Sequence, residues 1–403
     1  MMTLPPLPMR RAFTIIELMV AVLLSSIVVL GTFGLLNVSS RTFQTQTEAA
    51  QTVDQLNFAM EQVELDLRRA GFLTVPNAHL PSEDYAWYQT VCAPPSWMSA
   101  DGVGGVGHGI FFDEIAASGV DAFYRPRPTD QVWTDALPDR IVMLGAFRAT
   151  RRFRPTAMAA GSQSITISHT PEESARIDDI FGGSIVAVTS PQGGTQFLTV
   201  SEVTVGTTSS VITTAQSIQA DPSNGVNEAC KFTGFGTQMF EVTPLQFVRY
   251  SVQNDPNDRA STVLVREELG SGYSDLPTPS RYVVARNIVD FQLWFDGVPA
   301  LGASNVMLRD GNPLDADGAI QNATLAGTNA STPEDLRYAY VQMSGRLSGE
   351  VARNVTEGAG ELRQFMELRE WDGVNYAYNG RFTRLYTMRS EVELTNFTLA
   401  SLR

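Results

Sequence analysis

A single carboxylate, Glu17, stands inside an apolar run near the start of the 403-residue sequence. No charged residue occurs from Leu18 to Leu36, and Ile15 and Ile16 extend the run on the other side of Glu17. A charged side chain within a hydrocarbon layer costs about 3 kcal/mol, so such residues are usually functional. The chemistry open to Glu17 is pairing with a cation, because an unpaired buried charge is strongly penalised.

No other set of side chains forms a recognisable catalytic site. The three histidines stand in loop-like contexts, and none has a second ligand at metal-binding spacing. No nucleophile-elbow motif supports a serine hydrolase. We therefore predict that the protein is not an enzyme. The histidines are His79, His108 and His169.

Two charged segments carry groups that could bind an ion or a polyanion. The segment "DGNPLDADG" (310–318) has clustered oxygen ligands but neither the EF-hand spacing nor a closing glutamate, so we interpret it as an acidic surface turn and expect no cofactor. A calcium loop here would use Asp310, Asn312, Asp315 and Asp317. The segment "RATRRFRP" (148–155) is the one basic patch. Because the net charge is −14, we interpret it as a charged strand edge and do not expect nucleic-acid binding.

The two cysteines are Cys92 and Cys230. In an exported protein such a pair indicates a disulfide. The bridge would close a loop of about 140 residues and stabilise the fold by roughly 4–5 kcal/mol in the chain-entropy model. The alternative is two buried free thiols.

The apolar run around Glu17 is long enough to cross a membrane. A helix from Phe13 to Leu36 would be roughly 36 Å long, and a bilayer core is about 30 Å thick. Arg10 and Arg11 precede the run, so the short N-terminus should stay cytoplasmic. An ordinary secretory signal has a shorter apolar stretch. A plain signal anchor explains the length but not the carboxylate.

The segment "RRAFTIIELMVAVL" (10–23) resembles the type III signal sequence of type IV prepilins and type II secretion pseudopilins. The resemblance implies that a prepilin peptidase cleaves between Ala12 and Phe13, and that the new N-terminus at Phe13 is methylated. Ala12 stands where the family usually has glycine. Glu17 would be the fifth mature residue, and its pairing with the N-terminal amine of a neighbouring subunit would set the register of a filament.

Beyond Leu36 the sequence predicts an amphipathic helix that continues to Phe72, with Gly71 as its stop. Apolar residues recur at spacings of three and four along one stripe. We expect this stripe to pack on the protein's own sheet, although a coiled coil would use the same pattern. The stripe consists of Ala49, Val53, Leu56, Met60, Val63, Leu67 and Ala70.

The remainder of the chain is predicted to be a β-rich head. Many short runs alternate apolar and polar residues, as antiparallel strands with one buried face do. Two loop-like stretches, 101–109 and 297–334, are long enough to be functional or mobile. The nine expected strands are 140–144, 164–168, 184–190, 196–205, 245–253, 261–268, 289–297, 337–347 and 384–394.

The predicted fold class is therefore α+β and pilin-like: a long N-terminal helix, half transmembrane, packed on a mainly antiparallel β-sheet head with long loops. We expect a leader at 1–12 and a transmembrane and filament-core segment at 13–36. An exported amphipathic half follows at 37–72, and the head occupies 73–403.

The segment "LDLRRAGF" (65–72) resembles the helix-end signature of PilW-type minor pilins and of J-type pseudopilins. The resemblance implies a minor pilin that primes or caps a type IV pilus. It would sit in the inner membrane with a periplasmic head and later reach the pilus and cell surface. Its implied partners are the prepilin peptidase, other minor pilins, the major pilin and a tip adhesin.

Two alternatives stay open at this point. A J-type pseudopilin of type II secretion would share the same helix, but such proteins tend to be shorter than this chain. A signal-anchored periplasmic binding protein would share only the membrane segment. Residues 76–237 have no counterpart in the resemblance.

Overall fold

The computed structural model divides the chain into two compact units, Met1–Gln51 and Thr52–Arg403. Helix α1 (Ile15–Arg69) contributes to both units. The described residues are 14–70, 78–79, 89–92, 110–112, 138, 140–149, 151–191, 194–219, 239–255, 258–270, 280–297, 306–308, 336–347, 365–371 and 376–395.

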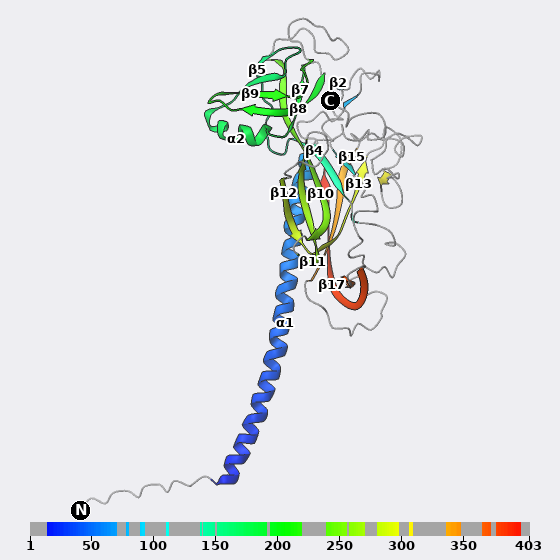
Figure 1. Ribbon diagram of the computed structural model, residues 1–403. Coiled ribbons are helices and arrows are strands. Elements are labelled where there is room, and N and C mark those ends of the chain that lie inside the picture. The colour runs from blue at the N-terminus through cyan, green and yellow to red at the C-terminus, as the bar shows by residue number, and fades with distance from the viewer. Residues whose placement is uncertain are drawn as a thin grey trace, which may run out of the picture. The chain divides into compact units, whose positions relative to one another are not determined.

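Helix α1 is 55 residues long, and this confirms the single long N-terminal helix (Figure 1). The helix is long and apolar enough to cross a membrane. In the second unit its apolar stripe is buried from Leu56 to Ala70, as the spacing predicts. The helix ends at Arg69, shortly before the expected stop at Gly71, which lies outside the described residues.

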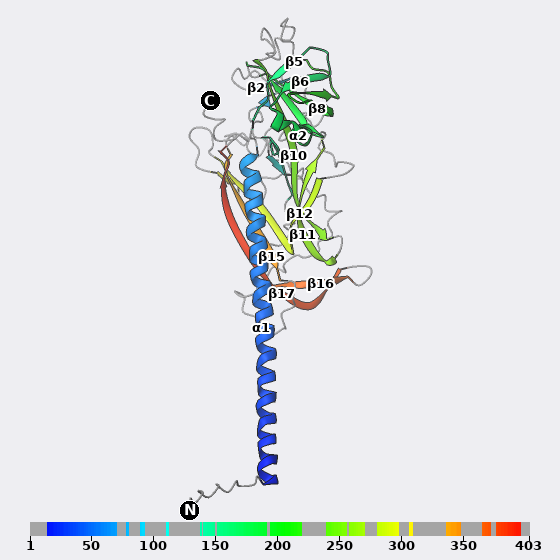
Figure 2. The ribbon, with the colours of Figure 1, turned by 90° about the vertical axis from the view of Figure 1, so that its left-hand side faces the viewer.

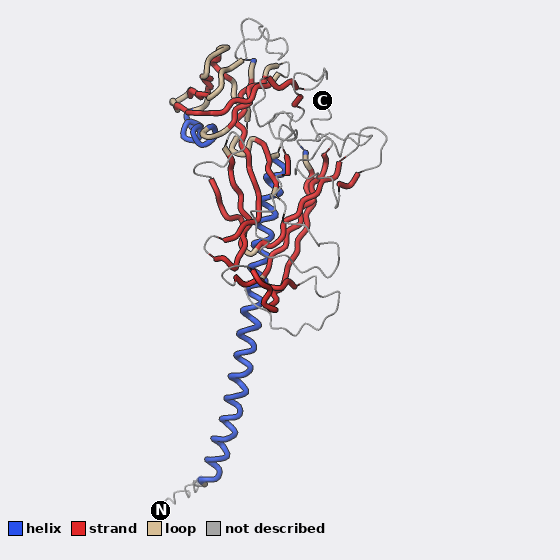
Figure 3. The backbone as a smooth tube through the Cα atoms, turned by 45° about the vertical axis from the view of Figure 1, so that its right-hand side comes forward, coloured by secondary structure: helices blue, strands red, loops and turns tan. Residues whose placement is uncertain are grey.

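The head contains two sheets, and strands make up most of its described part (Figure 3). The larger sheet follows the order β12-β11-β10-β7-β8-β9-β6-β5, with β1 to β4 attached beside β8 and β10. Most of its pairs are antiparallel, and only β1–β2 and β2–β8 are parallel. Its strands are β1 (Ala78–His79), β2 (Gln89–Cys92), β3 (Ile110–Phe112), β4 (Ile141–Gly145), β5 (Pro155–Met158), β6 (Ser164–Ser168), β7 (Ile185–Thr189), β8 (Thr195–Thr204), β9 (Ser209–Thr214), β10 (Glu241–Asp255), β11 (Asp258–Leu269) and β12 (Ser280–Arg286).

The smaller sheet is wholly antiparallel and follows the order β14-β13-β15-β17-β16. Asn287 alone separates β12 from β13, so one residue carries the chain from the first sheet to the second. Its φ of 59° lies in the left-handed region, which asparagine tolerates better than most residues. The strands are β13 (Ile288–Gly297), β14 (Val306–Leu308), β15 (Leu336–Arg346), β16 (Phe365–Trp371) and β17 (Tyr376–Glu393).

The buried half of α1 lies between the two sheets, with β10 to β12 on one side and β13, β15 and β17 on the other (Figure 2). Strand β4 shows why the larger sheet is buried on both faces. Ile141 and Met143 belong to the core that contacts α1, whereas Val142 and Leu144 point into a second core. Since side chains alternate across a strand, an uninterrupted apolar run such as "IVML" fits a strand between two cores.

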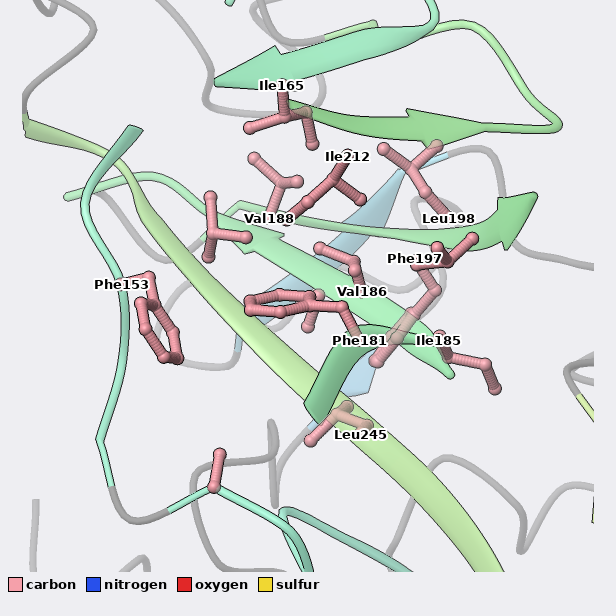
Figure 4. Close-up of a cluster of buried hydrophobic side chains, with 14 of the residues drawn as sticks. Phe153, Ile165, Phe181, Ile185, Val186, Val188, Phe197, Leu198, Ile212 and Leu245 are labelled. Carbon is pink, nitrogen blue, oxygen red and sulfur yellow. The ribbon is translucent and has the colours of Figure 1, made fainter. Parts of the chain in front are cut away.

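The second core fills a small closed barrel that is inserted in the chain between β4 and β10. Its strands follow the order β10-β7-β8-β9-β6-β5, and Phe153, just before β5, returns to β10. The Phe153 and Val242 backbones exchange two N–H···O bonds of 2.8 Å, which closes the ring of strands. Phe153 and Phe181 meet edge to face inside it, with ring centroids 5.1 Å apart (Figure 4). We call β5 to β9, α2 (Pro171–Phe181) and residues 241–245 of β10 the inserted barrel.

All nine expected strands are present; most of their ends shift by a few residues, whereas β17 begins eight residues before the expected start at 384. The sequence does not predict helix α2 or the strands β1, β2, β3, β5, β9, β12, β14 and β16, and β14 (Val306–Leu308) lies within the stretch 297–334 that was expected to be a loop. His79 lies in the short strand β1 rather than in a loop. His108 and most of the two long loops lie outside the described residues.

The N-terminal helix as the candidate assembly site

Glu17 forms a reciprocal set of hydrogen bonds with Thr14 at the first turn of α1. The Thr14 backbone N–H and hydroxyl each lie 3.0 Å from Glu17 Oε2, and the Glu17 N–H donates to Thr14 Oγ1 at 3.3 Å. This arrangement is a capping box, which satisfies backbone donors that a helix start leaves without partners. Glu17 therefore has a local structural role as well as the predicted role in register.

The helix surface that follows is apolar on every side within the first unit. Its large apolar side chains from Ile15 to Val38 are between 51% (Val29) and 78% (Ile15) exposed. A helix that is apolar all round needs a lipid or protein environment rather than water. The described structure supplies no cover for this surface, which suits a segment that inserts in a membrane or a helix bundle.

The few hydroxyl groups of the apolar segment are satisfied within the helix. Ser25 and Ser26 both donate to the Val22 carbonyl, at 2.9 and 2.7 Å, and Thr32 donates to the Val28 carbonyl at 2.8 Å. Polar groups that bond to their own helix cost little in hydrocarbon. Glu17 is the one ionisable side chain from Ile15 to Leu36, and it is therefore the polar group of this segment that would cost most in hydrocarbon.

The C-terminal end of α1 is fixed in the head by a buried carboxylate, which the sequence analysis does not identify. Asp66 is 2% exposed and accepts hydrogen bonds from Arg266 Nε at 2.6 Å and from the Tyr250 hydroxyl at 2.8 Å. Burial, together with the negative charge of Asp66, raises the pKa of Tyr250 well above its ordinary value. Burial alone would lower the pKa of Arg266, but the Asp66 carboxylate outweighs it and raises that pKa.

A signal for Asp66 was present in the helix periodicity. Ala59, Val63, Asp66 and Ala70 recur at spacings of four, three and four, so they share one face of the helix. A carboxylate on a buried face requires a cationic or hydrogen-bonding partner. The partner could not be named from the sequence, because Arg266 lies 200 residues further along the chain.

A second position on α1 contacts the smaller sheet. The Ser390 hydroxyl in β17 donates a short hydrogen bond to the Glu64 carboxylate. Glu64 also forms an i,i+4 ion pair with Arg68 at 3.3 Å. The C-terminal half of α1 therefore has polar contacts with both sheets in addition to its apolar stripe.

The basic segment 148–155 carries three arginines that are paired with glutamates. Arg148 contacts Glu268 and Arg152 contacts Glu241 through short ion pairs, and Arg151 contacts Glu173 at 2.6 Å. The segment leads into β5, which ends the path of the larger sheet.

His169 makes a short contact with a serine, and both side chains are buried. Its Nε2 lies 2.7 Å from Ser210 Oγ, and its Nδ1 lies 2.9 Å from the Thr170 carbonyl. Ser210 is only 1% exposed, and its hydroxyl oxygen also accepts from the Gly206 N–H at 3.3 Å. Within the described residues there is also no group of three or more His, Cys, Asp or Glu side chains suited to a metal ion.

Several predicted site residues lie outside the described residues. These are Ala12 and Phe13 at the expected cleavage site, Cys230, and the Asp310, Asn312, Asp315 and Asp317 cluster. The backbone of Cys92 lies in β2, but its side chain is not described. The disulfide, the cleavage and the absence of a calcium loop therefore stay predictions.

Comparison with known families identifies the N-terminal segment. Residues 7–33 match the family described as "Prokaryotic N-terminal methylation motif". The motif indicates the type IV pilin and pseudopilin class of proteins, with processing by a prepilin peptidase. The long N-terminal helix and the mostly antiparallel head form the α+β architecture of that class. Searches of curated proteins and of solved structures found no match to the chain.

Proposed function

We propose that the protein is a minor pilin of the PilW type, which primes or caps a type IV pilus. Before assembly it would reside in the inner membrane with its head in the periplasm. The prepilin peptidase would remove residues 1–12, and the new N-terminus at Phe13 would be methylated. It would then join other minor pilins and the major pilin in the filament. A tip adhesin is a further proposed partner.

The observation that carries this proposal is the position of Glu17 within the segment 7–33 that matches the methylation motif. A membrane anchor needs no carboxylate there, because the charge opposes insertion. A subunit whose helix leaves the membrane for a bundle of like helices gains from it. In that low-dielectric setting, the neighbour's N-terminal amine can pair with the carboxylate in only one axial register.

The inserted barrel supports a priming or cap position over a place in the shaft. The barrel adds a second hydrophobic core to the head, and the chain returns from it to the same sheet through β10. Subunits in the shaft of a filament repeat at a fixed spacing, and a large inserted barrel on each head would limit how closely neighbouring subunits can pack. A cap subunit has no neighbour on its outer side.

Mass spectrometry of the protein from membranes tests the class assignment. The expected mature N-terminus is N-methylated Phe13, and a strain without prepilin peptidase should retain residues 1–12. An intact Met1 in the otherwise normal strain would refute the pilin-type proposal and favour a signal-anchored periplasmic protein.

The choice between a pilus and a secretion system needs a second experiment, because the matched motif is common to both classes. We expect deletion of the gene to reduce surface pili while secretion of exoproteins stays normal. The opposite result would favour a J-type pseudopilin of type II secretion. Detection of the protein in sheared pili, at a small fraction of the major subunit, is the expected sign of a cap.

A further inference from the structure

The inserted barrel is joined to the rest of the head by two stretches of chain. One is the segment 146–149 after β4, and the other is β10, whose first half pairs with β7 and whose second half pairs with β4 and β11. Apolar packing from β4 adds cohesion between the two parts. The hydrophobic effect has little directionality, so the orientation of the barrel depends on directional contacts, which include the backbone pairing of β10 with β7, β4 and β11 and of β8 with β2.

A directional side-chain contact caps the C-terminal end of α2. Arg148 Nη1 donates to the Asp179 carbonyl at 2.6 Å and to the Gly182 carbonyl at 3.3 Å. The last carbonyls of a helix have no intrahelical partners and carry partial negative charge, so a cation there is favourable. Helix α2 has no basic residue in its own last turn. Arg148, which lies at the entry to the barrel, supplies that cation.

Gln246 holds the same junction from the other connecting stretch. Its Oε1 accepts from the Phe147 and Arg148 N–H groups at 3.0 and 3.2 Å, and its Nε2 donates to the Ile180 carbonyl at 3.2 Å. The side chain is 4% exposed, so these bonds are shielded from water. Both stretches of chain that lead to the barrel are therefore bonded to the end of α2.

A series of ion pairs links the guanidinium of Arg148 to helix α1. It forms a short ion pair with Glu268, and Glu268 accepts from Arg266 Nη1 at 3.2 Å. Arg266 in turn pairs with Asp66 on α1 at 2.6 Å. The side chains of Asp66, Arg266 and Glu268 are each at most 10% exposed. We call Asp66, Arg266, Glu268 and Arg148 the charge chain.

We propose that the charge chain fixes the orientation of the inserted barrel relative to the head portion of α1. Charges alternate along it from the helix to the carbonyls at the end of α2, so Arg266 and Glu268 each lie between two oppositely charged partners. Hydrogen bonds weaken steeply when their angles change. A rotation of the barrel would therefore break several of them together. The charge chain would thus hold the barrel at one fixed angle to the head portion of α1. This inference does not depend on the proposed pilus function.

Distance measurements in the full-length protein in detergent micelles test the proposal. Spin labels would be attached through ketone-bearing unnatural amino acids at Glu61 on α1 and Glu202 on β8, both exposed, so that Cys92 and Cys230 stay unlabelled. The unaltered charge chain should give one narrow distance peak. Arg148→Met keeps much of the apolar stem but removes the charge, and the narrow peak should be lost.

Arg151→Met is the matched control, because Arg151 pairs with Glu173 inside the barrel. It should leave the narrow peak in place. Hydrogen exchange of β7 and β8 in each variant checks that the barrel core stays folded. An unchanged peak in a folded Arg148→Met protein would overturn the proposal. The same would follow if Arg151→Met broadened the peak as much as Arg148→Met.

Discussion

Asp66 on helix α1 accepts a 2.6 Å hydrogen bond from Arg266 Nε on β11, although 200 residues separate the two in the chain. Both side chains are buried, 2% and 9% exposed. The pair joins the element that matches the methylation motif to the sheet that supports the inserted barrel. The attachment of the head to its helix thus depends on a specific polar contact as well as on apolar area.

We expect Asp66→Ala to destabilise the head strongly. The substitution removes the carboxylate nearer to the buried Arg266 guanidinium, which keeps only its longer contact with Glu268 at 3.2 Å, and it removes the nearer acceptor of the Tyr250 hydroxyl. Loss of one partner of a buried pair costs about 3–5 kcal/mol. Chemical denaturation of the full chain in detergent, followed by near-ultraviolet circular dichroism, measures the free energy of unfolding.

Two further variants separate the pair from general effects on the helix. Asp54→Ala removes an exposed carboxylate from α1 and should change stability by less than about 0.5 kcal/mol. Replacing Asp66 and Arg266 together by leucine should recover part of the loss, because no charge is then left unpaired. Equal stability of Asp66→Ala and Asp54→Ala would contradict the role of the pair.

Two glycines that face α1 should differ in their tolerance of alanine. A Cβ at Gly145 would lie 2.7 Å from the Arg69 carbonyl oxygen, whereas a Cβ at Gly345 would meet the Leu56 and Thr52 side chains at 3.3 Å. A backbone carbonyl at a helix end cannot rotate away, but side chains can shift. Gly145→Ala should therefore cost about 1–3 kcal/mol and Gly345→Ala clearly less, as measured by thermal unfolding. The reverse order would contradict this account.

The parts of the fold that depend on local pattern were predictable. The stripe that includes Leu56, Met60 and Val63 is set by helical spacing, and "SITIS" alternates as β6 does with outer residues exposed and inner ones buried. Helix α2 also had a local signal. Thr170 and Glu173 form a capping box with proline at the helix start, but the helix is only 11 residues long and lies among strands, so this local signal is weak.

The parts that depend on distant pairing were not predictable. The barrel closes because Phe153 pairs with Val242, which lies 89 residues later in the chain. Nothing in the sequence near either residue indicates the other. The same holds for Asp66 with Arg266 and for Arg148 with Glu268. A buried charge requires a partner, but a single sequence does not say which one. The fold class was therefore accessible, whereas the charge chain needed the structure.

The stability of the smaller sheet should depend on pH through Asp290. Burial raises the pKa of this carboxyl, and hydrogen bonds from Gln292 and Gln342 offset only part of the effect. Asp290 thus favours the folded state while it is protonated, and that stabilisation is lost as pH rises above the ordinary aspartate pKa of about 3.9 and through the raised value. Asp290→Asn resembles the protonated form and keeps an oxygen acceptor for Gln292.

We therefore expect Asp290→Asn to unfold at a higher temperature than the unaltered protein at pH 7. The difference should shrink as the pH falls toward about 4, where both proteins carry a neutral group at this position. Glu393→Gln, which changes an exposed carboxylate of the same sheet, is the control and should show no such trend. A pH-independent difference for Asp290→Asn would show that charge burial is not the cause.

Glu17→Val should leave the protein in the membrane but block its incorporation in pili. The substitution makes the segment more apolar, so insertion is favoured, while the carboxylate that would pair with a neighbour's amine is lost. Thr14→Val separates register from helix capping, because it removes the capping hydroxyl and keeps the carboxylate. Immunoblots of membranes and sheared filaments should show normal incorporation for Thr14→Val alone. Equal recovery of Glu17→Val in filaments would remove the register role, and an equal block in both variants would assign the defect to the cap.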